Sequence, residues 1–199
     1  MDGYKYDVFI SYPNRPPVVD WVKNHLYPLL AQWLPQCTPV EWEPRIFVDF
    51  ESIDTGAEWP ATIRQAIKRS RCLVPVFCVP YFRSRWCCSE LDTMRRREGH
   101  LQLRTEANPR GLIYPVVFWD GDSFPEYAKT IQQRNLSAWA DPYPTFSHTI
   151  AYSEFLATVR TVCKELAELI LNAPDWDSEW PTVDSAPIAQ PALPLPRVK

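Results

Sequence analysis

The chain has 199 residues, of which 46% are hydrophobic and 23% are charged, so it is long enough for one globular domain with a sizeable core. Its formal net charge of −3 argues against a general nucleic-acid-binding protein, and we expect no direct binding to nucleic acid. The amino-terminal residues lack the apolar core of a signal peptide, and no apolar run reaches membrane-spanning length. We therefore expect a soluble, cytoplasmic protein that does not bind a membrane.

Strands and helices are predicted to alternate along the chain. The β-branched and aromatic run at 6–12 predicts a buried strand, and apolar residues at helical spacing predict a helix from Pro17 to the residue before Pro35. The further predicted strands are 46–50, 72–79, 112–119 (with Pro115 favouring an edge or a bulge) and 136–139. The further predicted helices begin at Pro60 or cover 86–98, 125–134 and 152–172. This alternation predicts an α/β fold of three layers, with a five-stranded, mostly parallel sheet and helices on both faces.

Two regions are expected. Residues 1–173 contain all the predicted elements and form one domain. Residues 174–199 are rich in proline and acidic side chains and show no helical pattern, which predicts a tail or a linker.

The six cysteines have no CxxC spacing and no histidine at the spacing of a metal ligand. We expect free thiols in a reducing compartment, and no metal site. The three histidines, at positions 25, 100 and 148, are isolated in sequence and are expected at the surface. Cys87 or Cys88 could form a nucleophile early in a helix, where the helix dipole favours a thiolate, but this alternative is disfavoured.

Several nucleotide-binding and hydrolase motifs are absent from the sequence. With only five glycines, the chain has neither GxGxxG nor GxxxxGK[ST], and it also lacks GxSxG and HExxH. The most informative segment is instead 79–91, which leaves an apolar strand, passes through a loop and opens a helix. On that helix Trp86 and Glu90 are four residues apart and share one face, at the sheet edge where α/β proteins place ligand chemistry.

Three motifs together resemble the Toll/interleukin-1 receptor (TIR) domain family. Residues 6–12 are similar to the first sequence box of the family, and residues 49–71 resemble its BB loop and second helix. Residues 84–91, Ser-Arg-Trp-Cys-Cys-Ser-Glu-Leu, match the S-x-W-C-x-x-E-L signature of the plant and bacterial enzymes of the family. The motifs stand in the family's order, and the resemblance, to the NAD+-consuming prokaryotic type, covers about residues 5–172.

This resemblance implies a flavodoxin-like fold and cleavage of the nicotinamide–ribose bond of NAD+, with NAD+ as substrate and no cofactor. It makes Glu90 the catalytic carboxylate. The residues then expected to contact the substrate are Ser11, Tyr12, Arg15, Asp49, Phe50, Ser84, Trp86 and Trp119. In the BB-like loop, Asp54, Gly56 and Trp59 are expected to gate the site and to take part in assembly.

One carboxylate is chemically sufficient for this reaction. Glycosidases ordinarily use a second carboxyl group to protonate the leaving group. Nicotinamide departs as a neutral molecule from a cationic ring, so no general acid is needed. The remaining carboxylate can stabilise the positive charge that develops on the ribose.

Alternatives remain open for the function. The resemblance implies self-association through TIR–TIR contacts and a role as an immune effector, for example in antiviral defence, that is activated by assembly. A sensor domain or a partner protein could supply the trigger. A cyclase that makes a cyclic ADP-ribose messenger would differ only in the nucleophile that attacks the ribosyl cation. A scaffold of the same family, acting only by homotypic contacts, would have no enzymatic activity.

Overall fold

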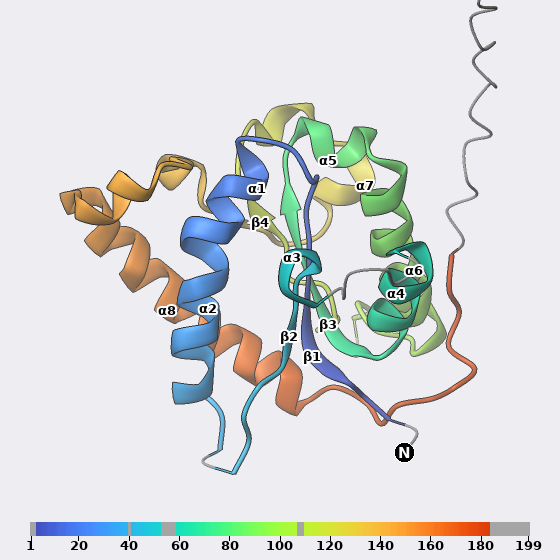
Figure 1. The fold of residues 1–199 in the computed structure, drawn as a ribbon. Helices are drawn as coiled ribbons and strands as arrows, with labels where there is room; N and C mark the ends of the chain where they lie inside the picture. Colours follow the sequence, from blue (N-terminus) through green and yellow to red (C-terminus); the bar gives the residue numbers. More distant parts are fainter. Residues whose placement is uncertain (1–2, 40, 53–58, 107–109, 184–199) are drawn as a thin grey trace, which may run out of the picture.

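The computed structural model describes residues 3–39, 41–52, 59–106 and 110–183. Five strands form one sheet in the order β2-β1-β3-β4-β5, and every neighbouring pair is parallel (Figure 1). The strands are β1 (Tyr6–Ser11), β2 (Ile46–Phe47), β3 (Ser70–Phe77), β4 (Val116–Val117) and β5 (Arg134–Asn135). The predicted α/β fold is confirmed, and its strand order is that of flavodoxin-like sheets.

Helices cover both faces of the sheet (Figure 1). On one face lie a continuous helix, made of α1 (Val18–Trp21), the π turn η1 (Val22–Leu26) and α2 (Tyr27–Trp33), and the long α8 (Ile150–Leu171). On the other face lie α4 (Trp59–Lys68) and α6 (Arg85–His100). The short helices α3 (Asp49–Ser52), α5 (Val79–Arg83) and α7 (Glu126–Lys129) lie in connections, as do the single turns η2 (Leu34–Gln36), η3 (Gly121–Ser123), η4 (Ser137–Trp139) and η5 (Pro144–His148). Within the described ranges, none of the helices has the length and apolarity needed to cross a bilayer.

All five strands differ from their predicted bounds, the first and third by only one or two residues at an end and the other three by more. The second ends at Phe47 because the chain turns into α3 at Asp49, so Asp49 lies on a helix rather than in a strand. The fourth is reduced to Val116–Val117 because Pro115 has no N–H to donate to the sheet. The fifth ends at Asn135, whose side chain accepts a hydrogen bond from the Ser137 N–H and starts a turn where a strand was predicted.

The core lies on both sides of the two central strands. The side chains of Val8, Phe9 and Ile10 in β1 are all buried, and so are those of 72–77 in β3. The Phe9 and Phe47 rings stack with their centroids 4.8 Å apart, which joins β1 to the edge strand β2. Burial on both faces explains why these strands appear in the sequence as continuous apolar runs.

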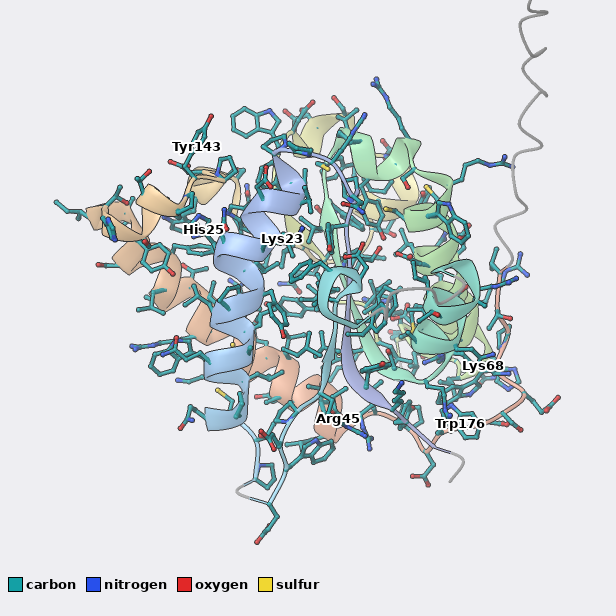
Figure 2. All side chains as sticks on the ribbon, viewed as in Figure 1. Lys23, His25, Arg45, Lys68, Tyr143 and Trp176 are labelled. Atoms are coloured by element: carbon teal, nitrogen blue, oxygen red, sulfur yellow. The ribbon has the colours of Figure 1, made fainter. Side chains whose placement is uncertain are left out.

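The first ten residues of the expected tail, 174–183, pack against the domain as an extended segment, which we call the strap. Trp180 in the strap is only 3% exposed. Trp176 donates a hydrogen bond from Nε1 to the carbonyl oxygen of Lys68 at 3.3 Å, and the two side chains lie at the same end of the molecule (Figure 2). The remainder of the expected tail, 184–199, lies outside the described residues.

Candidate active site

A cavity opens at the point where the strand order reverses. From β1 the chain leads first outward to β2 and then back across to β3, and the crevice beyond the carboxyl ends of two such strands is the usual ligand site of open α/β sheets. Here that crevice contains a cavity of about 180 Å³. Its lining residues come from β1, β2, α3, α4 and α6, from the loop that follows β1, and from the residue before α6: Phe9, Ile10, Ser11, Tyr12, Asn14, Phe47, Asp49, Ile63, Ser84, Trp86, Cys87 and Glu90.

Helix α6 carries Glu90 into this cavity. The helix begins immediately after Ser84, whose hydroxyl oxygen accepts a hydrogen bond from the Cys87 N–H at 3.3 Å and so satisfies one free donor of the first turn. Trp86 and Glu90 follow in the first two turns and both line the cavity, as their four-residue spacing predicts. Ser84, expected to contact substrate, therefore also fixes where the helix begins.

The carboxyl group of Glu90 is almost entirely buried. Its side chain is 8% exposed, and Oε2 lies 2.5 Å from Ser11 Oγ at the end of β1. Burial raises the pKa of Glu90 to about 8, the nearby charge of Asp49 adds to this increase, and the Ser11 hydrogen bond opposes it. A carboxyl group that titrates near neutral pH inside a cavity is typical of functional sites.

Tyr81 does not line the cavity but contacts Ser11 from behind it, and no sequence motif indicates it. Its hydroxyl oxygen lies 2.9 Å from Ser11 Oγ and donates to the carbonyl oxygen of Cys87 at 3.1 Å. The side chain is fully buried, and it comes from the short helix α5, between β3 and α6. Its position after the third strand, at the same sheet edge as Ser11, is the one sequence signal that could have indicated it.

A second pair of polar side chains closes the cavity toward α3. The Tyr12 hydroxyl donates a hydrogen bond to Asp49 Oδ1. Burial and this bond to a carboxylate both raise the pKa of Tyr12 well above its ordinary range. The contact connects the residue that follows β1 to the short helix α3 at the start of the BB-like loop.

The predicted substrate-binding residues divide into two groups. Ser11, Tyr12, Asp49, Ser84 and Trp86 line the same cavity as Glu90, and the structure thus brings these six together. Arg15, Phe50 and Trp119 are not among the lining residues. Trp119 is 61% exposed: β4 ends at Val117, which leaves Trp119 in the connection that follows the strand.

The BB-like loop lies largely outside the described residues. Asp54 and Gly56 fall there, and for Trp59 the structure describes only the backbone at the start of α4. The predicted roles of these three residues in gating and assembly stay predictions.

The disfavoured cysteine alternative gains no support from the structure. Cys87 lines the cavity, but its burial raises the pKa of the thiol well above its ordinary value, which disfavours a thiolate. Among the described residues, no group of three or more His, Cys, Asp or Glu side chains could hold a metal ion.

The prediction that all three histidines lie at the surface is wrong for His25. This side chain is buried, and its Nε2 donates to the carbonyl oxygen of Tyr143 at 3.0 Å on the α1–α8 side of the molecule (Figure 2). Burial lowers the pKa of His25, and its contacts anchor the loop before α8 rather than the cavity.

Comparison with known proteins identifies the family. A family model described as a TIR domain matches residues 8–148, more than half of the chain, and the protein therefore belongs to the TIR domain family. Similar solved structures include the crystal structure of the TIR domain of the Toll-related receptor TRR-2 from Hydra magnipapillata, at 18% identity over 78% of this chain and 99% of that chain, with a TM-score of 0.47. Another is the structure of the TIR domains in the activated Roq1 resistosome directly recognizing the pathogen effector XopQ, at 21% identity over 82% of this chain and 84% of that chain, with a TM-score of 0.40.

Proposed function

We propose that this TIR domain is an NAD+ nucleosidase that cleaves the nicotinamide–ribose bond, with Glu90 as its catalytic carboxylate. The observation that carries the proposal is the position of Glu90: a buried carboxyl group at the switch point of the sheet, lining a cavity with Ser11 and Trp86. The same carboxyl group stands in the S-x-W-C-x-x-E-L motif of residues 84–91.

The chemistry follows from the charge of the substrate. The nicotinamide ring of NAD+ is cationic, and positive charge moves onto the ribose as the ring departs. A carboxylate beside the ribose stabilises that charge, and it does so more strongly inside a closed cavity than in water. Because an adjacent cation favours the ionised form of a carboxyl group, binding of NAD+ would also lower the raised pKa of Glu90.

The size of the cavity supports activation by assembly. At about 180 Å³ it is smaller than the pockets of about 300–1,000 Å³ that enclose drug-sized ligands. We propose that it encloses the nicotinamide–ribose bond, while the rest of NAD+ needs further surface. We propose that a neighbouring copy supplies that surface through TIR–TIR contacts, as suits an immune effector that is silent as a monomer.

The first test is incubation of the full chain with NAD+ at high protein concentration, with chromatography of nicotinamide and of the ADP-ribose products. Light scattering on the same sample reports assembly. We expect Glu90→Gln to reduce nicotinamide release by about 100-fold or more. The matched control is Glu126→Gln, because the Glu126 side chain is 90% exposed and lies on α7, outside the cavity lining.

The products and the assembly state separate the alternatives. Linear ADP-ribose would establish a hydrolase, and a cyclic isomer would establish a cyclase. Release that is unchanged in Glu90→Gln would contradict the assignment of Glu90. A chain that is assembled and releases no nicotinamide would instead act as a scaffold.

A further inference from the structure

Four oxygen atoms form a hydrogen-bonded chain that begins at the Glu90 carboxyl group. Glu90 Oε2 lies 2.5 Å from Ser11 Oγ, Ser11 Oγ lies 2.9 Å from Tyr81 Oη, and Tyr81 Oη lies 3.1 Å from the carbonyl oxygen of Cys87. All four residues are buried. Three contacts therefore join two hydroxyl groups, one carboxyl group and one carbonyl group away from bulk water.

Counting protons shows which form of Glu90 satisfies this chain. A carbonyl oxygen can only accept, so the single Tyr81 proton must point toward Cys87. Tyr81 must then accept the single Ser11 proton. The contact between Ser11 and Glu90 has a proton only if the Glu90 carboxyl group supplies it. With Glu90 ionised, two protons remain for three contacts, and one contact is lost.

We propose that Glu90 is a neutral acid in the absence of substrate and that the hydrogen bond from Tyr81 to the Cys87 carbonyl, which is kept only when Glu90 is neutral, favours this state, which makes Tyr81 a positioning residue for the reaction. This inference rests on the proposed function only in naming NAD+ as the cation that reverses the arrangement. The state of the Glu90 proton can be measured whether or not the protein cleaves NAD+.

When Glu90 ionises, the hydrogen bonds among Glu90, Ser11 and Tyr81 reverse their donor–acceptor direction, and no heavy atom needs to move. The Glu90 O–H bond breaks and its proton passes to water at the mouth of the cavity. The Ser11 hydroxyl then turns to donate to the carboxylate, and the Tyr81 hydroxyl turns to donate to Ser11. Cys87 loses only the tyrosine contact, because its position inside α6 gives its carbonyl oxygen a helical partner four residues further on.

The other polar groups near Glu90 also favour the neutral acid in the resting protein. Asp49 on α3 adds negative charge, and Tyr12 from the end of β1 is hydrogen-bonded to it. Cys87 lies on the same helix as a buried thiol. A cation would act in the opposite sense: Arg64 on α4 lines a small second cavity that Glu90 also borders, but its side chain is exposed.

The test titrates Glu90 directly. In protein labelled with carboxyl-13C glutamate, the signal that is missing in Glu90→Gln belongs to Glu90, and its chemical shift is followed with pH in the absence of NAD+. We expect wild-type Glu90 to titrate several pH units above an exposed glutamate. Titration in the ordinary glutamate range would overturn the proposal without any further variant.

Two substitutions then test the role of the chain. Tyr81→Phe removes the extra hydrogen bond of the neutral form, so the Glu90 pKa is expected to fall by about half to one unit. Ser11→Ala removes the donor to the carboxylate, so the pKa is expected to stay or rise. The matched control is Tyr114→Phe, which removes a hydroxyl group that is bonded to Glu165, far from the cavity lining, and leaves the Glu90 titration unchanged.

Activity gives a second readout. If the protein releases nicotinamide, the ratio of kcat/KM in Tyr81→Phe to that in the wild type is expected to be higher at pH 6.5 than at pH 9. If Tyr81 had a purely structural role, Tyr81→Phe would lower kcat/KM by the same factor at pH 6.5 and at pH 9. A Glu90 pKa in Tyr81→Phe that is unchanged or higher would overturn the assignment of Tyr81, even if NAD+ cleavage is confirmed.

Discussion

The guanidinium carbon of Arg97 lies 4.1 Å from the centre of the Trp180 ring, and both side chains are buried. Arg97 Nη1 donates to the carbonyl oxygen of Ser70 at 2.7 Å, and Nη2 donates to those of Ile67 and Lys68, each at 3.1 Å. These carbonyl groups lie where α4 ends and β3 begins. A single arginine on α6 therefore holds the neighbouring helix and strand together, and the strap covers it with an indole face.

Trp180→Ala is expected to lower the free energy of unfolding by about 2–4 kcal/mol, because it removes a large buried side chain and the cation–π contact with Arg97. Urea denaturation of the full chain measures this change. The matched control is Trp119→Ala, which is expected to change stability by about 0.5 kcal/mol or less, since Trp119 is 61% exposed. Equal effects of the two substitutions would show that the strap adds nothing to the stability of the domain.

Glu90→Gln is expected to stabilise the protein increasingly as pH rises. The pKa of Glu90 is raised to about 8 in the folded state, so the folded protein holds this proton more tightly than the unfolded chain does. The contribution of Glu90 to stability is thus intact below about pH 4 and falls as pH rises toward 8. We expect the variant to be more stable than wild type by about 2–4 kcal/mol at pH 8.5 and nearly equal at pH 4.5. Denaturation at the two pH values tests this, and a difference that does not depend on pH would contradict it.

Asp49→Asn is expected to lower the pKa of Glu90 by about half a unit, because it removes a negative charge while the amide oxygen can still accept from the Tyr12 hydroxyl. The 13C titration of Glu90 measures the shift. The acid side of the pH profile of nicotinamide release should move to lower pH by the same amount. Asp122→Asn, at an exposed position on η3, should leave both unchanged.

The cysteines are expected to divide by burial in their reaction with iodoacetamide. Cys72, Cys78, Cys87 and Cys163 are buried, and burial raises the pKa of each thiol, so their alkylation in the native protein should be slow. Cys37 and Cys88 are partly exposed and should react first. Mass spectrometry of peptides from native and urea-unfolded protein shows the order. Rapid modification of native Cys87 would reopen the cysteine alternative.

The kinds of element and their order could be predicted from the sequence, because the buried strands and amphipathic helices produce distinct periodic patterns. The ends of the strands could not, since they depend on single residues such as Pro115 and Asn135 that act through local hydrogen bonds. The sequence does not indicate Arg134–Asn135 as a strand, because this strand is two residues long and has no apolar pattern.

The site was predictable where a motif placed its residues and not where tertiary contacts did. Glu90 and Ser11 follow from the family motifs. Tyr81 does not, because its hydroxyl reaches Ser11 only through the unpredicted turn of α5. The strap has no periodic pattern, and its two tryptophans find their partners on helices more than 80 residues away in sequence.

Val183 of the strap and Glu90 line the same small cavity between α4 and α6, and the Val183 N–H donates to Thr93 Oγ1 on α6 at 3.0 Å. This proximity allows strap docking and proton binding at Glu90 to be linked, and any such linkage is reciprocal. If lifting the strap admits water and makes Glu90 easier to ionise, then ionising Glu90 must weaken the strap by the same free energy. In that case a cationic substrate that binds at the carboxyl end of the sheet and ionises Glu90 would also loosen the strap on the far side of α6.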